Sequence, residues 1–298
     1  MTLSRRAILG AALLPLAACG TTEEPAAAGP SPSASAPAPD EGLTALEQRF
    51  GARLGVYAVN TGTGATIAHR ADERFAFCST FKALAAAAVL TRNPMSHLDT
   101  LVTYTRADLM KNSPITSKNV ATGMTIRDLC DAAIRYSDGT AGNLLIRDLG
   151  GPGELTAYAR SLGDDVTRMD RVEPDITEAT PGDPRDTTSP RAYGGDFQRI
   201  VLGEALPAEK RDFLVDLLKR NLTGDARIRA GLPKDWVVAD KTGTGDYGTL
   251  NDFAVAWPPS GAPLLIGIMS SKDTQDAPYD QALLAEAARY AAERLTGG

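Results

Sequence analysis

The feature that most constrains the fold is the placement of β-rich runs at the two ends of the chain, with helical sequence between them. Residues 53–60 (RLGVYAVN) alternate in polarity, and Gly62 and Gly64 predict a turn into a partner strand at residues 65–69. Three further β runs near the C-terminus are separated by Gly and Pro turns: residues 236–241, 252–257 and 263–270. Short turns between such runs predict an antiparallel sheet.

The middle of the chain has helical periodicity. Residues 81–90 (FKALAAAAVL) are apolar on every side, which is typical of a buried helix. Other predicted helices cover residues 125–136, 140–149, 208–221 and 280–295. We therefore expect an α/β fold in which an antiparallel sheet flanked by helices is interrupted by an inserted all-helical domain. The expected bounds are 42–75 and 220–298 for the α/β domain and 76–219 for the inserted domain, with a ligand cleft between them.

The first nineteen residues indicate a targeting segment. Ser4 to Leu9 (SRRAIL) has the twin-arginine pattern, and the apolar run that ends at Ala18 is shorter than the ~20 residues that span a bilayer. Small residues then lead to Cys19, which predicts a lipidated N-terminus on the outer side of the cytoplasmic membrane. An ordinary cleaved signal, giving a periplasmic or secreted protein, is the alternative. Residues 20–41 are almost entirely Ala, Pro, Ser, Thr, Gly and acidic residues and predict a disordered tether.

Composition excludes several function classes. A net charge of −6 and a pI near 5.1 argue against a nucleic-acid partner. No Cys/His group has metal-ligand spacing, so we expect neither a metal nor another cofactor. Cys78 and Cys130 lie in apolar helical sequence and are expected to remain free thiols. A monomer is the expected oligomeric state.

Ser79 and Lys82 form the first motif that indicates chemistry. If Ser79 opens the buried helix, Lys82 returns to the same face three residues later and can hydrogen-bond the hydroxyl. A serine needs a group that removes its proton, and a desolvated lysine can serve. By itself this S-x-x-K spacing is weak evidence, because it also fits a capped helix with a surface lysine.

Two further motifs are ordinary when taken alone. Ser137-Asp138-Gly139 follows a predicted helix and fits a turn, although a second serine there can relay a proton. Lys241-Thr242-Gly243-Thr244-Gly245 ends a β run, where Lys241 and the threonine hydroxyls can bind a carboxylate beside a glycine-flanked strand edge. The alternative for this segment is a simple hairpin corner.

Together and in this order, the three motifs resemble those of penicillin-recognising serine enzymes, and in particular of class A serine β-lactamases. The resemblance extends from about Gly42 to the end of the chain. It implies a helical domain inserted in an α/β domain and hydrolysis of β-lactam antibiotics through an acyl-enzyme on Ser79. The middle motif usually has Asn at its third position. Gly139 removes that amide and is expected to widen the cleft.

The resemblance to the class A branch rests on residues 171–187, which are similar to its Ω loop. Glu173 matches the general base that activates the hydrolytic water, and Asn143 matches the residue that orients this base. Arg171 and Asp186 match the ion pair that closes the neck of the loop.

The loop departs from the family pattern at one position. The branch usually has Glu-x-x-Leu-Asn, whereas this chain has Ile176 and Thr177 after Glu173. The missing asparagine normally shares the hydrolytic water with the glutamate. Thr177 keeps an oxygen on a shorter side chain, so slower or differently tuned deacylation is expected.

The family also implies the groups that bind substrate. Asn143, Lys241, Thr242 and Thr244 match binding positions. The arginine that meets the substrate carboxylate follows the third motif in some relatives, but Leu250 stands there in this chain. Other relatives place it upstream, where Arg227 fits and Arg229 is the alternative. Asn112 occupies a rim position that is aromatic in many relatives, so ligands are expected to meet less stacking surface.

In the implied mechanism, Ser79 attacks the lactam carbonyl and loses its proton either to Lys82 or, through water, to Glu173. The backbone N–H groups of Ser79 and Thr244 bind the oxyanion, and Ser137 passes a proton to the ring nitrogen. Glu173 then drives water onto the ester.

The sequence can be compared with three other functions. A penicillin-binding D,D-peptidase shares the three motifs but does not need Glu173. A β-lactam sensor that is acylated without turnover is compatible with Gly139 and Thr177. A His-based serine hydrolase is disfavoured, because neither His69 nor His97 has a motif around it.

Overall fold

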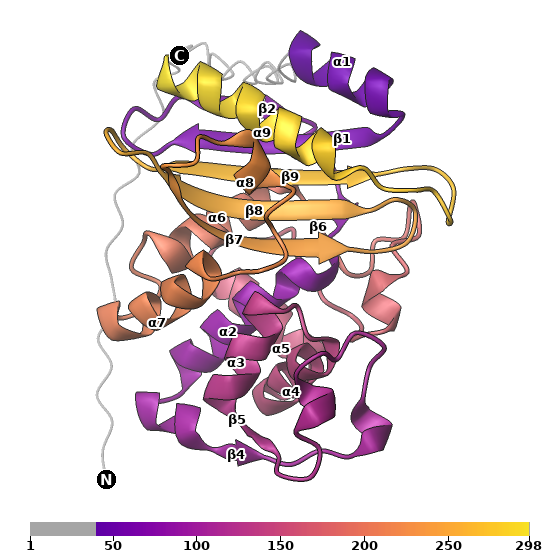
Figure 1. Ribbon diagram of the computed structural model, residues 1–298, viewed down its shortest axis with the longest axis vertical. Helices are drawn as coiled ribbons and strands as arrows, with labels where there is room; N and C mark the ends of the chain where they lie inside the picture. The colour runs from indigo at the N-terminus through magenta and orange to yellow at the C-terminus, as the bar shows by residue number, and fades with distance from the viewer. Residues whose placement is uncertain (1–39, 298) are drawn as a thin grey trace, which may run out of the picture. The chain divides into compact units, whose positions relative to one another are not determined.

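The computed structural model describes residues 40–297, so Cys19 and the predicted targeting segment lie outside the described residues. In this range a five-stranded antiparallel sheet, in the order β2-β1-β9-β8-β7, has helices on both sides (Figure 1). Its strands are β1 (Arg53–Asn60), β2 (Thr66–His69), β7 (Val237–Thr244), β8 (Leu250–Trp257) and β9 (Leu264–Ser271). Two short ribbons pair β3 (Phe75–Ala76) with β6 (Thr187–Thr188) and β4 (Leu101–Val102) with β5 (Met124–Thr125).

The helices confirm the predicted alternation of β and α sequence. The α-helices are α1 (Glu41–Phe50), α2 (Phe81–Arg92), α3 (Ile126–Arg135), α4 (Gly139–Leu149), α5 (Pro152–Ser161), α6 (Pro190–Val201), α7 (Ala208–Lys219), α8 (Ile228–Gly231) and α9 (Gln281–Thr296). Short 3-10 turns are η1 (Cys78–Thr80), η2 (Met95–Asp99), η3 (Arg106–Asp108), η4 (Thr116–Lys118) and η5 (Asp175–Thr177). The expected antiparallel sheet with a helical region between its strands is therefore present.

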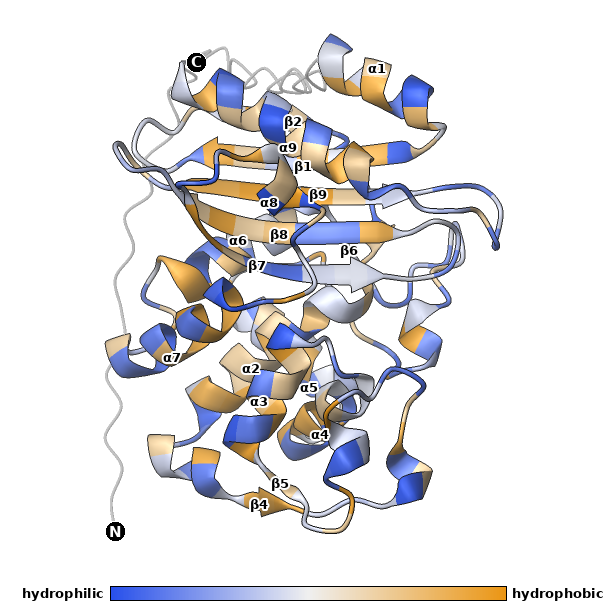
Figure 2. Ribbon diagram, viewed as in Figure 1, coloured by the Kyte–Doolittle hydropathy of each residue, from blue (hydrophilic) through white to orange (hydrophobic). Residues whose placement is uncertain are grey.

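The central strands are buried on both faces, which explains their nearly continuous apolar sequence. Along β8, Phe253 and Val255 join the core that contains α2 and α6, whereas Ala254 and Ala256 join the core under α1 and α9. Figure 2 shows α9 as an amphipathic helix with hydrophilic and hydrophobic residues in alternating bands. This two-sided burial fixes the sheet that carries the third sequence motif.

Helices α1, α5, α6 and α8 were not predicted. The tether was expected to reach residue 41, but the Asp40 carboxylate caps α1 by accepting from the backbone N–H groups of Gly42 and Leu43 at 3.0 and 3.2 Å. Helix α6 contains two adjacent glycines, which disfavour a helix in sequence terms. Gly194 allows it to approach the sheet, since a Cβ there would lie 3.1 Å from Tyr57. The proposed domain boundaries remain a prediction.

Within residues 40–297, no helix has the length and apolarity needed to cross a membrane.

Candidate active site

Ser79 lies in the 3-10 turn η1, which runs directly into the buried helix α2. The turn delivers Lys82 to the serine hydroxyl, with Lys82 Nζ 2.9 Å from Ser79 Oγ. Lys82 is fully buried, as its alanine-rich surroundings predicted. The preceding residue, Cys78, has a φ of 47°, in the left-handed region that few non-glycine residues adopt. Cys78 is the first residue of the turn that presents the Ser79 hydroxyl to its partners.

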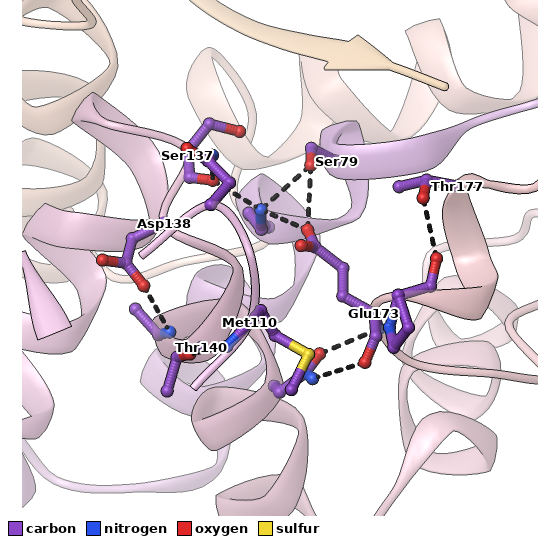
Figure 3. Close-up of polar contacts among 12 residues, drawn as sticks. Ser79, Met110, Ser137, Asp138, Thr140, Glu173 and Thr177 are labelled. Carbon is purple, nitrogen blue, oxygen red and sulfur yellow. Dashed lines mark hydrogen bonds and ion pairs between the residues drawn. The ribbon is translucent and has the colours of Figure 1, made fainter. Parts of the chain in front are cut away.

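The Glu173 carboxylate contacts both Ser79 and Lys82 (Figure 3). Its Oε1 lies 2.6 Å from Lys82 Nζ and 3.1 Å from Ser79 Oγ, although it is more than 90 residues away in sequence from both. Asn143 holds its backbone at both ends: Asn143 Nδ2 donates to Glu173 O at 2.8 Å, and Glu173 N donates to Asn143 Oδ1 at 3.0 Å. Ser79 and Lys82 thus meet at the Glu173 carboxylate, and Asn143 holds the backbone of the same residue.

Ser137 and Lys241 form the opposite side of the site. Lys241 Nζ lies 3.1 Å from Ser137 Oγ, and the Ser137 carbonyl accepts from Lys82 Nζ at 2.8 Å. Burial, together with the nearby positive charge of Lys82, lowers the pKa of Lys241 well below its usual value. Ser137 has a φ of 54°, so its hydroxyl and its carbonyl serve two different lysines from one strained residue.

Arg227 and Thr223 form hydrogen bonds with the remaining residues of the third motif on strand β7. Arg227 is 6% exposed and donates from Nη1 to the carbonyls of Gly243 and Asn251 at 2.7 and 2.9 Å. Its Nη2 donates to Thr244 Oγ1 at 2.8 Å. Thr242 Oγ1 lies 2.5 Å from Thr223 Oγ1. The upstream arginine predicted from the resemblance therefore reaches the motif.

The alternative, Arg229, does not. Its Nε donates to Asp240 Oδ1 at 2.6 Å, and its Nη2 donates to backbone carbonyls that include Leu218 and Val238. Leu250, at the other expected position for an arginine, is fully buried. Arg227 is thus the arginine that contacts the third motif.

Residues 38–295 match the model of the β-lactamase enzyme family. The chain belongs to this family. It is 58% identical over 249 residues to a β-lactamase of Mycobacterium tuberculosis, covering 82% of this chain and 81% of that protein. It is 53% identical over 269 residues to a β-lactamase of Amycolatopsis lactamdurans, covering 90% and 89%. A solved β-lactamase structure from Desulfarculus baarsii superposes with a TM-score of 0.83 at 50% identity, covering 85% of this chain and 95% of that one.

Compared with the β-lactamase pattern described above, Gly139 does not open the cleft as expected. A Cβ at this position would lie 2.2 Å from Glu173 Oε2 and 3.1 Å from Met110 Cβ. The space left by the missing side chain is therefore filled by the Glu173 carboxylate. The expectation of a wider cleft assumed that nothing would move into that space.

Thr177 keeps its oxygen but directs it elsewhere. Its Oγ1 donates to the carbonyl of Pro174 at 2.7 Å, so the hydroxyl hydrogen is committed to the loop backbone (Figure 3). The backbone carbonyl of Thr177 accepts from Asp246 N at 2.9 Å and joins the loop to the turn after β7. In this β-lactamase, Thr177 acts in the structure of the loop.

Asn112 has a role that the sequence analysis missed. Its Nδ2 donates to the Ser137 carbonyl at 2.9 Å, and its backbone carbonyl accepts from Gly139 N at 2.7 Å. Asn112 therefore holds both sides of the second motif in addition to lying at the rim. The two partners are 25 and 27 residues away in sequence, so no local sequence pattern predicts these contacts.

The neck of the loop has the predicted ion pair. Arg171 Nε donates to Asp186 Oδ2 at 2.7 Å, and Asp186 Oδ1 accepts from the backbone N–H groups of Asp170 and Arg171 at 2.7 and 2.9 Å. Asp186 is 1% exposed. One buried carboxylate thus joins the start of the loop to its end.

We expect Asp186→Asn to lower the free energy of unfolding by about 2 kcal/mol, because hydrogen bonds to a charged partner are each worth ~1.5–3 kcal/mol and the amide presents N–H groups to other donors. Urea unfolding checks this. Glu178→Gln is the matched control, since Glu178 binds the same arginine but is exposed, and it is expected to change stability by less than about 1 kcal/mol. Equal effects of the two substitutions would contradict the assignment of Asp186 to the neck.

The two cysteines and two histidines of the described residues form no hydrogen bond with Ser79, Lys82 or Glu173. Cys78 and Cys130 are free and buried, as predicted, and burial raises the pKa of both thiols, that of Cys130 to about 12. His69 faces Glu47 at 3.4 Å, and His97 faces Asp148 at 3.0 Å. Among residues 40–297 there is no cluster of three or more potential metal ligands.

Proposed function

We propose that the chain hydrolyses the β-lactam amide of penicillin-type antibiotics through an acyl-enzyme on Ser79, and so gives resistance to them. The observation that carries the proposal is the Ser79 hydroxyl lying between Lys82 and Glu173, at 2.9 and 3.1 Å. A poor nucleophile is here in contact with a carboxylate and an amine. The names of relatives support a β-lactamase, and the three motifs read with Glu173 support the class A assignment.

Acylation requires a group to accept the Ser79 proton. Lys82 Nζ donates to Ser79 Oγ, Ser137 O and Glu173 Oε1, which uses all three N–H groups of an ammonium. The Ser79 hydroxyl in turn donates to Glu173 Oε1. This pattern favours Glu173 as the acceptor, with Lys82 as the positive charge that holds the two oxygens together. Oγ then bonds to the lactam carbonyl carbon, and the backbone N–H groups of Ser79 and Thr244 bind the oxyanion.

Ring opening breaks the carbon–nitrogen bond and needs a proton at the leaving nitrogen. Ser137 supplies it from its hydroxyl while Lys241 Nζ donates to Ser137 Oγ at 3.1 Å. The proton that Glu173 took from Ser79 then passes through Lys82 to Ser137, which leaves Glu173 a carboxylate again. Deacylation follows when Glu173 takes a proton from water, the water oxygen bonds to the ester carbon, and the Ser79 oxygen leaves with a proton. Arg227, Thr244 and Lys241 bind the substrate carboxylate, with Thr242 and Asn143 supporting them.

Mass spectrometry of the soluble domain mixed with a penicillin, with product followed over time, tests the proposal. We expect product far beyond one equivalent and only a transient adduct on Ser79. A stable adduct with one equivalent consumed would favour the sensor or the D,D-peptidase. Absence of any adduct would overturn the proposal.

We also propose that the protein is exported by the twin-arginine route and anchored through lipid on Cys19, as a monomer. The support is the sequence of residues 1–19. Mass analysis of the mature N-terminus tests the anchor, since a diacylglyceryl group on Cys19 is expected. An unmodified N-terminus would contradict it.

A further inference from the structure

We propose that the missing side chain at Gly139 sets the position of the Glu173 carboxylate, which makes Gly139 a positioning residue for proton transfer. The inference rests on the proposed function. Gly139 is the buried first residue of α4, and its Cα faces Glu173 Oε2. A Cβ would lie 2.2 Å from that oxygen, closer than real Cβ atoms come to a neighbour, and 3.1 Å from Glu173 Cδ, which is a tight contact, so the carboxylate would have to move.

The carboxylate is held between Gly139 and its hydrogen-bond donors. Oε2 lies against Gly139, while Oε1 accepts from Lys82 Nζ at 2.6 Å and from Ser79 Oγ at 3.1 Å. The backbone of Glu173 is fixed at both ends by Asn143. A side chain at position 139 therefore cannot be accommodated by moving the loop, and the flexible carboxylate must retreat by about an ångström.

A second glycine of α4, one turn later, also leaves room for a side chain of the site. A Cβ at Gly142 would lie 2.6 Å from Lys82 Cε and 3.0 Å from Phe81 Cζ. The two glycines share a face of α4 because they are three residues apart. One makes room for the carboxylate and the other for the lysine, so this glycine face brings Glu173 and Lys82 into direct contact.

The consequence is a short path for the Ser79 proton. With the carboxylate in its present place, Ser79 Oγ donates to it directly. Moving it by an ångström lengthens this contact, and a misplacement of that size costs about 100-fold in rate. Gly139 thus acts on the rate constants of proton transfer through Glu173.

The test is Gly139→Ala, with the rate of acylation by a chromogenic cephalosporin measured in single-turnover experiments. We expect acylation to slow by about 100-fold, with the thermal unfolding temperature changed by only a few degrees. Gly153→Ala in α5 is the control, because nothing lies within 4 Å of a Cβ at that position.

A double-mutant comparison separates positioning from general disruption. In a Glu173→Ala background, Gly139→Ala is expected to leave the acylation rate unchanged, since the group it displaces is gone. Equal slowing in both backgrounds, or no slowing in the wild type, would overturn the inference alone. Wild-type adduct formation is measured first, because its absence overturns the proposed function as well.

Discussion

Replacing Glu173 by Gln is expected to lower kcat by a factor on the order of 10²–10⁴, the usual contribution of a positioned acid–base group. The amide keeps the size of the side chain and the two backbone contacts with Asn143, but it does not accept a proton from water. Acylation also slows, because Glu173 Oε1 is the acceptor of the Ser79 proton. Deacylation slows more, because Lys82 Nζ at 2.9 Å still holds the Ser79 oxygen in place, whereas the hydrolytic water loses its base. The acyl-enzyme is therefore expected to persist, which intact-protein mass spectrometry detects.

Asp175→Asn is the matched control for this experiment. Asp175 is an exposed carboxylate two residues farther along the same loop. Its replacement is expected to leave kcat within about twofold of the wild type, since surface substitutions have small effects. If the Glu173→Gln variant turned over at the wild-type rate with no accumulated adduct, the role of Glu173 as the hydrolytic base would be wrong.

Replacing Asp196 by Asn is expected to stabilise the protein at alkaline pH. Asp196 lies on α6 with no exposed surface, and within residues 40–297 neither of its carboxyl oxygens has a hydrogen-bond partner. Burial, and then the charge of the neighbouring Asp164, raise its pKa from 3.8 to about 9. The folded chain therefore holds a proton here that the unfolded chain releases.

The pH dependence follows from these two values. Below pH 3.8 the carboxyl of Asp196 is protonated in both the folded and the unfolded chain, so it does not make the free energy of unfolding depend on pH. Between pH 3.8 and about 9 only the folded state keeps the proton, so each pH unit costs the wild type about 1.4 kcal/mol. Asn has no carboxyl proton to lose, so its contribution to stability does not change over this pH range. The variant is expected to match the wild type near pH 4 and to exceed it by a few kcal/mol at pH 8.

Urea unfolding at pH 5 and pH 8 measures this difference. Asp165→Asn is the control, because this neighbouring carboxylate is exposed. Parallel stability curves for the wild type and Asp196→Asn across that range would show that Asp196 is ionised in the folded protein, and the assignment of a retained proton to Asp196 would be wrong.

The sequence predicts those parts of the structure that depend on local pattern. The alanine-rich run 81–90 shows that Lys82 is buried beside Ser79, and alternating β runs predict the sheet. The three motifs, read with Glu173 and its neighbours, predict most of the residues that meet at the site. The motifs allow this prediction because the residues of each motif lie in one turn or at one strand end, so they stay close together in the fold.

Features that depend on contacts between distant segments could not be predicted. Asn112 contacts Ser137 although η4, β5 and α3 lie between them in the chain, and the raised pKa of Asp196 on α6 depends partly on the charge of Asp164, which follows α5. Gly139 was read as empty space, because its effect depends on where the Glu173 side chain points. Such contacts follow from tertiary packing, which a single sequence does not display.

The wide sequence separation between the catalytic partners determines when activity appears during folding. Lys82 and Ser137 are 55 residues apart, Ser79 and Glu173 are 94 apart, and Ser137 and Lys241 are 104 apart. Such contacts give a high contact order, and their loops close late and slowly. Enzymatic activity should therefore return only in the last phase of refolding, after helical signal has recovered. Because the site residues come from distant segments, local unfolding of any one of these segments is expected to abolish activity. Hydrolysis therefore measures the fraction of fully folded protein.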